Sequence, residues 1–265
     1  MKVFISADIE GVSGCTTWDE TEIDKSAYEA YALQMTREVN AACEGANAAG
    51  ATEIVVKDAH DSGRNIDHSM LPQNTKLVRS WAGGLYSMVQ ELDSSFDCLI
   101  YIGYHSAAGT DYNPLSHTMD TMIDWLTIND QLASEFLIHS YIAAYHKVPI
   151  VFLSGDKGLC ETVRNVIPEI RTVAVKEGKG NSTINIHPLL AVDLIREEVR
   201  VALTGDMNDC QLELPDNFDI RIRFKNHKDA YKKSFYPSME KIDSNTLKFN
   251  SGDYIEVLRM FNYVI

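Results

Sequence analysis

Short β-branched apolar runs alternate with longer helical stretches along this chain, and this alternation limits the fold more than any other feature of the sequence. Strands are predicted at 2–7, 53–57, 97–104, 148–154 and 171–175, with a weaker candidate at 76–80. Helices are predicted over 27–48, 132–145, 157–166 and 188–203. Asn129 or Asp130 is expected to cap the second of these helices. Such an order of strands and helices is typical of α/β proteins with a parallel sheet.

The C-terminal part of the chain follows a different pattern. Apolar and charged residues alternate over 218–226, as in a strand with one solvated face. A further strand is predicted near 247–250 and a last helix over 253–263. We therefore expect an α/β domain at 1–205, with a mostly parallel open sheet flanked by helices. A smaller mixed α+β subdomain is expected at 206–265, and it need not fold independently.

Composition and charge exclude several kinds of partner. The 265 residues include 24 Lys and Arg against 38 Asp and Glu, which gives a net charge of −14. Such a chain repels the phosphates of nucleic acids and an anionic membrane surface, where a binding protein presents a basic face. No apolar run reaches the roughly 18–20 residues needed to cross a bilayer. We expect neither nucleic acid nor a membrane as a partner.

The amino terminus and the cysteines indicate where the protein resides. The apolar run that begins at Met1 ends at Asp8, which is too short for the apolar core of a signal peptide. The five cysteines are scattered and form no Cys-x-x-Cys pair, which favours reduced thiols over disulfides or a cysteine zinc site. We therefore expect a cytoplasmic protein.

The first three strong strands run directly into residues whose side chains bind metals. Asp8 and Glu10 follow the first strand two residues apart, which places both on one face of an extended chain. Asp58 and His60 follow the second strand with the same spacing, and His105 follows the third. In open α/β sheets, ligands bind outside the carboxyl ends of the strands. These side chains are therefore predicted to converge.

Carboxylates and imidazoles without thiols are a typical ligand set for zinc or manganese, and a carboxylate can bridge two such ions. Two ions activate water and polarise a carbonyl, so the cluster predicts a two-metal hydrolase. Further candidates are His117, Glu135 and His139. Glu135 and His139 lie four residues apart on a predicted helix, where an ordinary polar stripe is the simpler interpretation. Asp58 is expected to orient His60 or to cap the next segment rather than to bind metal.

Taken together, these motifs resemble the zinc-dependent D-aminopeptidase family of the dipeptide-transport-operon type. In chain order the resemblance is carried by Ser6-x-Asp8-x-Glu10-Gly11, Asp58-Ala59-His60, Gly103-Tyr104-His105, Ser116-His117 and Ser134-Glu135. It is clearest over 1–160. Lys57 stands where the family often has asparagine, and Ser134 where it often has glycine. These departures leave the ligands in place and bear on the shape of the pocket.

The resemblance implies a binuclear zinc site and a role for each of six residues. The implied metal ligands are Asp8, Glu10, His60, His105 and Glu135, with Asp8 as the bridging group. The implied catalytic residue is His117, either as a nucleophile or as a general acid or base. His139 has no counterpart in the family pattern and is not assigned a role.

The implied activity is hydrolysis of short peptides that begin with a D-amino acid, by a hydroxide activated between two zinc ions per chain. Mn²⁺ and Co²⁺ are alternative metals. The family also implies a homo-oligomer, a decamer built from two stacked rings of five subunits. On the residues alone, two other functions stay open. One is a different binuclear amidohydrolase or phosphoesterase, and the other is a non-catalytic protein that binds metal or peptide.

Overall fold

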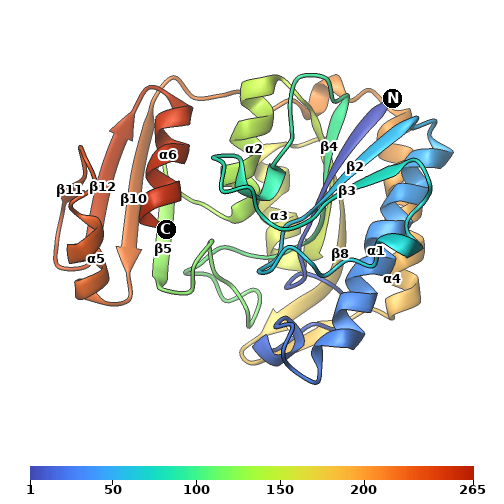
Figure 1. Ribbon diagram of the computed structural model, residues 1–265, viewed down its shortest axis with the longest axis horizontal. Helices are drawn as coiled ribbons and strands as arrows, with labels where there is room; N and C mark the ends of the chain where they lie inside the picture. The colour runs from blue at the N-terminus through green and yellow to red at the C-terminus, as the bar shows by residue number, and fades with distance from the viewer.

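Two sheets of different construction organise the chain, and the computed structural model describes residues 1–265 (Figure 1). The first sheet has seven strands in the order β3-β2-β1-β4-β7-β8-β9, and every neighbouring pair is parallel except β8 and β9. Its strands are β1 (Lys2–Ala7), β2 (Glu53–Asp58), β3 (Thr75–Val78), β4 (Cys98–Tyr104), β7 (Ile150–Asp156), β8 (Arg171–Lys179) and β9 (Ser182–Asn185). The predicted α/β class with a mostly parallel sheet is confirmed.

The middle of the parallel sheet is buried on both faces, because its strands are almost continuously apolar. Every residue of β4 is buried, as is all of β1 after Lys2. Strand β1 lies between β2 and β4, and Ala7 is opposite both Asp58 and Ile102. The chain segments that leave these three strands therefore start side by side at one edge of the sheet.

Helices cover both faces of this sheet (Figure 1). On one face α1 and α4 pack against each other, and α2 and α3 cover the other face. Their bounds are α1 (Tyr28–Ala48), α2 (Glu135–His146), α3 (Lys157–Val166) and α4 (Pro188–Thr204). None of the helices combines the length and the apolar character that a membrane span requires.

The second sheet is antiparallel and lies at the end of the molecule opposite α1 and α4 (Figure 1). It has five strands in the order β11-β12-β10-β5-β6, namely β5 (Ile123–Ile128), β6 (Gln131–Leu132), β10 (Phe218–Phe224), β11 (Glu240–Lys241) and β12 (Thr246–Ser251). Helices α5 (His227–Lys233) and α6 (Tyr254–Val264) belong to the same part of the chain. The Tyr254 hydroxyl of α6 donates a hydrogen bond of 2.5 Å to the Ile138 carbonyl of α2. Helix α6 therefore braces α2.

The predicted cap of α2 is wrong. The helix begins at Glu135 and its N-cap is Ser134, whose hydroxyl accepts from the Leu137 N–H. Asn129 and Asp130 have φ of 51° and 64° and form the turn between β5 and β6. Asn and Asp tolerate the left-handed region, which two-residue hairpin turns require. The same two residue types also favour helix N-caps, and here they form a hairpin turn that was not predicted from the sequence.

Candidate active site

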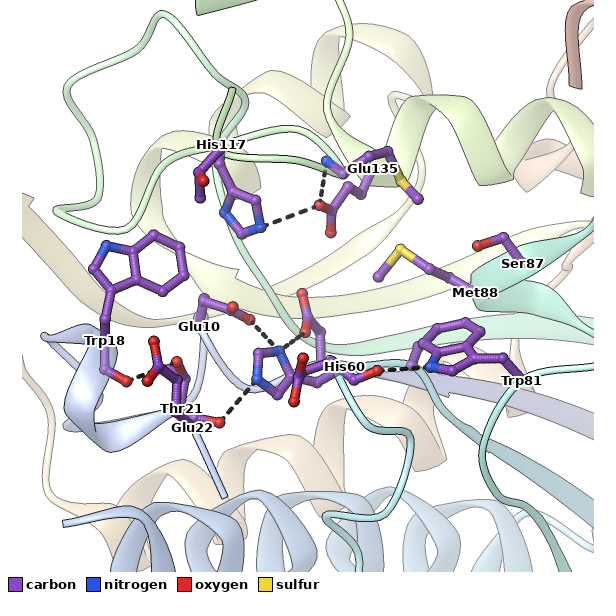
Figure 2. Close-up of a pocket in the computed structure, with 15 residues that line it drawn as sticks. Glu10, Trp18, Thr21, Glu22, His60, Trp81, Ser87, Met88, His117 and Glu135 are labelled. Carbon is purple, nitrogen blue, oxygen red and sulfur yellow. Dashed lines mark hydrogen bonds and ion pairs between the residues drawn. The ribbon is translucent and has the colours of Figure 1, made fainter. Parts of the chain in front are cut away.

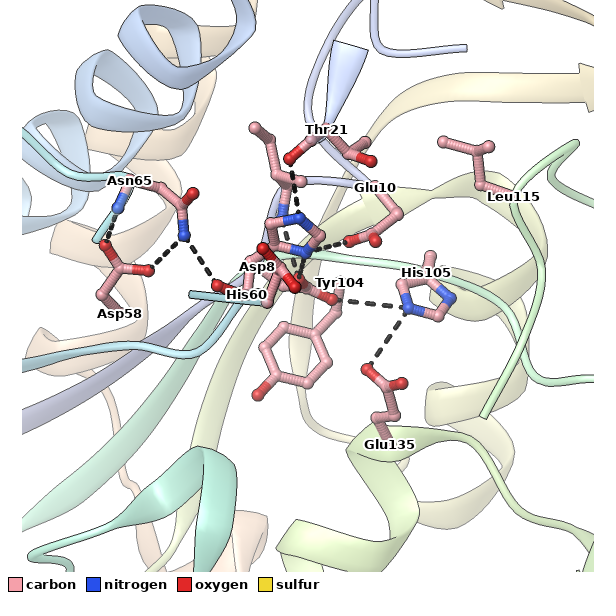
Figure 3. Close-up of polar contacts among 12 residues, drawn as sticks. Asp8, Glu10, Thr21, Asp58, His60, Asn65, Tyr104, His105, Leu115 and Glu135 are labelled. Atoms are coloured by element: carbon pink, nitrogen blue, oxygen red, sulfur yellow. Dashed lines mark hydrogen bonds and ion pairs between the residues drawn. The ribbon is translucent and has the colours of Figure 1, made fainter. Parts of the chain in front are cut away.

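The five predicted ligand residues meet at one place (Figure 3). Asp8 and Glu10 follow β1, His60 follows β2, His105 follows β4, and Glu135 is the first residue of α2. Each of the five is no more than 7% exposed. Side chains from segments more than a hundred residues apart are thus buried together at the carboxyl edge of the parallel sheet.

Glycine allows the ends of β1 and β4 to approach each other closely. Gly103 has φ of +70°, and a Cβ at this position would lie 2.3 Å from the Asp8 carbonyl oxygen. The Gly11 N–H donates to the Gly103 carbonyl at 2.8 Å, which fixes the loop that follows Glu10. Only glycine adopts this conformation and leaves this space without strain, which explains the glycine of the Gly-Tyr-His motif.

Asp8 lies between two histidines, with one carboxylate oxygen toward each (Figure 3). Its Oδ1 is 3.3 Å from His60 Nδ1, and its Oδ2 is 3.4 Å from His105 Nε2. Glu10 Oε2 lies 3.1 Å from the same nitrogen of His60. Glu135 Oε2 lies 3.3 Å from the same nitrogen of His105. The cluster therefore has two halves that share Asp8.

Backbone carbonyls fix the other nitrogen of each imidazole. His60 Nε2 lies 3.0 Å from the Thr21 carbonyl, and His105 Nδ1 lies 3.0 Å from that of Ser106. His117 Nδ1 lies 2.8 Å from the Leu115 carbonyl. A carbonyl accepts only from a protonated nitrogen, so each ring turns a lone pair toward the cluster when it is neutral. This is the usual arrangement of metal-bound histidines.

Three buried polar atoms of the cluster have no hydrogen-bond partner, namely Asp8 Oδ2, Glu10 Oε2 and His105 Nε2. Buried polar atoms are normally hydrogen-bonded, so unpartnered atoms that face one another point to a missing ligand. Asp8, Glu10 and His105 offer ligand atoms within 4.8 Å of one another, and so do His105, His117 and Glu135. Carboxylates and imidazoles without thiols fit a divalent ion such as zinc.

The charges of the cluster also favour a cation. Burial and the neighbouring Glu10 carboxylate raise the pKa of Asp8 well above its usual value. Burial opposes protonation of His60, but the Glu10 and Asp8 carboxylates outweigh it and hold the pKa of His60 well above its usual value. Both pKa shifts have the same cause, an excess of negative charge in a buried cluster. A bound cation would neutralise this charge.

His117 is held beside the cluster by aromatic contacts. Its ring stacks on His105 with centroids 4.3 Å apart and an interplanar angle of 10°, and Trp18 contacts it edge-on at 5.3 Å. Its Nε2 lies 3.5 Å from Glu135 Oε1, and that oxygen accepts a hydrogen bond from the Met119 N–H at 2.7 Å. The His117 side chain is 13% exposed, so it reaches both the cluster and the open cavity in front of it.

A cavity of about 630 Å³ opens over the cluster (Figure 2). Its lining includes Trp18, Trp81, Met88 and Met119 in addition to the cluster residues. Five acidic residues line the cavity, and no lysine or arginine does. Cavities of this size hold ligands such as a short peptide, and the acidic lining favours a positively charged group.

Asp58 caps the segment that follows β2. Its carboxylate accepts from the backbone N–H groups of Asn65 and Ile66 at 2.5 and 2.8 Å, and from the Asn65 amide at 2.7 Å. The same Asn65 amide donates to the His60 carbonyl at 2.8 Å. Asp58 therefore holds the backbone of His60 through Asn65, as the capping alternative predicts.

His139 lies outside the cluster. Its Nδ1 bonds the Glu135 carbonyl at 2.7 Å, and its Nε2 accepts from the Met88 N–H at 3.4 Å. Burial lowers the pKa of His139 to about 4, so the ring is neutral. Its position one turn after Glu135 serves to hold Met88 at the cavity wall.

Sequence reasoning missed Lys176 and the two tryptophans of the cavity. Lys176 is buried in β8, and its ammonium donates to the carbonyls of Glu10 and Cys15, which ties the first loop of the site to the sheet. The only indication of its role in the sequence is its position directly after the apolar run at 173–175. Trp18 and Trp81 lie in loops, where no periodicity distinguishes them from surface residues.

Comparison with known proteins agrees with this geometry. The chain matches peptidase family M55, D-aminopeptidase, over residues 1–263. A D-aminopeptidase of Bacillus subtilis (strain 168) is 31% identical over 262 residues, which cover 97% of this chain and 93% of that protein. The solved structure of the Zn-dependent D-aminopeptidase DppA from Bacillus subtilis, a self-compartmentalizing protease, matches with a TM-score of 0.91 at 29% identity, over 98% of this chain and 95% of the other. The chain therefore belongs to the D-aminopeptidase family, as its motifs predict.

Proposed function

We propose that this member of the family is a zinc-dependent aminopeptidase that releases an amino-terminal D-residue from short peptides. Membership of the family makes it an aminopeptidase. The observation that carries the zinc dependence is the buried cluster with its unpartnered carboxylate and imidazole atoms. The zinc dependence named for the relative of known structure supports the same metal here.

In this proposal two zinc ions are held by Asp8, Glu10, His60, His105 and Glu135. The shared position of Asp8, with one oxygen toward each histidine, supports its role as the bridge. When bound, zinc supplies an activated water and polarises the carbonyl of the scissile bond. Asp58 and Asn65 hold the His60 backbone, and Lys176 holds the Glu10 backbone, so that the ligand atoms keep their places.

His117 acts on the scissile bond by moving a proton at Nε2. The Leu115 carbonyl holds its Nδ1, and the stacked His105 ring and the edge of Trp18 keep the imidazole from turning. Imidazole is the side chain best suited to proton transfer near neutral pH. The partly open position of His117, between the cluster and the cavity, supports this role.

The cavity selects the amino end of the substrate. Its lining contains five acidic residues and no lysine or arginine, so it attracts a peptide's free amino group and repels its carboxylate. The preference for D-residues rests on the family and not on a single contact.

The wider organisation of the protein is part of the same proposal. We infer a homo-oligomer, because the relative of known structure is a self-compartmentalizing protease, and we propose the ring-forming decamer that the family resemblance implies as its form. A cytoplasmic location is supported by five cysteines that are all unpaired. Residues 1–205 form the catalytic domain in this proposal. Residues 206–265 form a smaller subdomain that does not fold alone, since its strand β10 pairs with β5.

The test is release of amino acids from matched D- and L-amino-terminal dipeptides, before and after chelation, with phosphoesters as controls. The proposal predicts release that is selective for the D-series, is lost with chelation and returns with zinc. Faster cleavage of the L-series, or of a phosphoester, would contradict it.

A further inference from the structure

One wall of the cavity is formed by Trp81, at the end away from Trp18 (Figure 2). Trp81 is 37% exposed, and it lies near Met88 and Ser87 at this end. None of these three side chains bears a charge. An exposed indole beside a thioether offers a substrate a large apolar contact surface.

Beneath this wall lies Lys57, a fully buried lysine. Its Nζ is 3.8 Å from the centroid of the Trp81 ring and donates to the carbonyls of Asp58 and Ser80 at 2.6 and 2.7 Å. No carboxylate pairs with it. For stability alone an apolar side chain of similar length would serve as well or better, because a buried ammonium loses its hydration. The contacts of Lys57 instead hold the indole and the loop at Ser80 against the end of β2.

The loops that follow β2 and β3 contain residues in an unusual backbone conformation. Asp61 has φ of 40° and Ser80 has φ of 61°, both in the left-handed region. The Trp81 indole N–H donates to the Asp61 carbonyl at 2.6 Å, and the Ser80 N–H donates to the Gly63 carbonyl at 2.7 Å. Such conformations persist where surrounding contacts fix them, and they are concentrated at ligand-binding sites.

We propose that Trp81 is a specificity-determining residue, the wall of a subsite for a large apolar or aromatic side chain of the substrate, and that Lys57 is its positioning residue. This inference rests on the proposed function and names its substrate class. The ammonium occupies one face of the indole, and the remaining surface lines the cavity. No lysine or arginine lines the cavity, and Asp61, whose backbone carbonyl accepts from the Trp81 indole, places a carboxylate in the lining that disfavours an acidic substrate side chain.

The first experiment compares kcat/KM for dipeptides with D-Phe, D-Leu, D-Ala or D-Asp, placed in turn at the first and at the second position. In one of the two positions the wild type is expected to prefer D-Phe over D-Asp at least tenfold. Trp81→Ala lowers kcat/KM for D-Phe about tenfold more than for D-Ala, and Trp81→Phe, which keeps a ring, retains most of the preference. Phe235→Ala is the matched control, because Phe235 is 72% exposed and does not line the cavity. Equal losses for D-Phe and D-Ala in Trp81→Ala would overturn the proposal.

The second experiment tests the positioning role of Lys57 and does not depend on turnover. In Lys57→Met, KM for the D-Phe substrate is expected to rise severalfold more than kcat falls, and calorimetry is expected to show weaker binding of free D-phenylalanine. Circular dichroism checks that the variant is folded, and Trp81→Ala must weaken the same binding. If the wild type releases no amino acid from any peptide, the proposed function fails. The comparison of D-phenylalanine binding between the wild type and Trp81→Ala still tests whether Trp81 forms the subsite. Unchanged D-phenylalanine binding in a folded Trp81→Ala variant would overturn it.

Discussion

The two sheets place charged residues in opposite ways. On the antiparallel sheet Arg221 pairs with Asp130 and Asp219 at 3.4 and 3.3 Å, and all three side chains are partly solvated. At the carboxyl edge of the parallel sheet, Asp8 and Glu10 are buried, and no lysine or arginine side chain pairs with them. The same residue types are thus neutralised in solvent in one region and buried with an excess of negative charge in the other.

This difference in charge burial identifies the carboxyl edge of the parallel sheet as the functional region. Exposed ion pairs contribute about 0–1 kcal/mol each and can be replaced at little cost. Buried carboxylates without a cation cost several kcal/mol, so they persist where a bound ion or a reaction needs them. Charge changes in the two regions should therefore differ sharply in their effects.

The largest effect is expected at the buried edge. Asp8→Asn keeps the shape of the side chain but removes the charge that both halves of the cluster share. We expect dipeptide release to fall at least about a thousandfold in a folded protein, because two-metal sites depend on their bridging carboxylate. Asp130→Asn, on the antiparallel sheet, is the matched control and should keep its activity. Turnover near the wild-type rate in Asp8→Asn would remove the contrast between the regions.

The His117→Ala variant tests the proton-transfer role of the imidazole that lies between the cluster and the cavity. Loss of proton transfer should lower kcat by about 10²–10⁴-fold, and the five proposed ligands should retain the zinc content of the wild type. Steady-state kinetics on a D-dipeptide, together with metal content, measure both properties. His227→Ala provides an exposed histidine for comparison. A His117→Ala enzyme with full turnover would rule out any chemical role for this residue.

Glu38 is a buried carboxylate away from the cluster, and it sharpens the comparison. Its Oε1 accepts from the Ser13 N–H, its Oε2 has no partner, and burial raises the pKa of Glu38 from 4.5 to about 7. The unfolded chain therefore ionises at lower pH than the folded protein, and the stability that Glu38 provides below pH 4.5 is lost as pH rises through 7. Relative to the wild type, Glu38→Gln should gain about 3 kcal/mol in the free energy of unfolding between pH 4.5 and 8. Urea titrations at both pH values measure this gain, and an equal difference at the two would contradict it.

The smallest effect is expected on the antiparallel sheet. Arg221→Ala removes two exposed ion pairs, so the free energy of unfolding should change by less than about 1 kcal/mol, and kcat/KM should stay unchanged. Urea denaturation and dipeptide release check these values. A loss comparable to that of Asp8→Asn would mean that the antiparallel sheet takes a direct part in the site.

Much of the parallel sheet could be predicted from sequence, because its buried strands are continuous apolar runs. The strand at Lys2–Ala7 matches the prediction, and that at Cys98–Tyr104 differs by one residue. The strand at Ile123–Ile128 had no such signal, since it is neither a continuous apolar run nor a regular alternation, and it pairs with β10 from far along the chain. Pairing at that distance depends on tertiary packing and not on local pattern.

The convergence of Asp8, Glu10, His60 and His105 could be predicted because parallel strands bring their carboxyl ends to one edge. Glu135 could not be assigned from periodicity, since only the resemblance to a family separated it from His139. The position of Lys57 beneath Trp81 could not be predicted from the sequence, because that contact joins strand β2 to a loop whose position depends on the folded backbone.

The central claim is that the buried cluster holds zinc, and elemental analysis of the purified protein tests it most directly. We expect about two zinc ions per chain in the wild type after reconstitution, and clearly fewer in Asp8→Asn. Circular dichroism on both samples ensures that folded proteins are compared. A wild-type protein that takes up no metal, or an Asp8→Asn variant with an unchanged zinc count, would contradict the account.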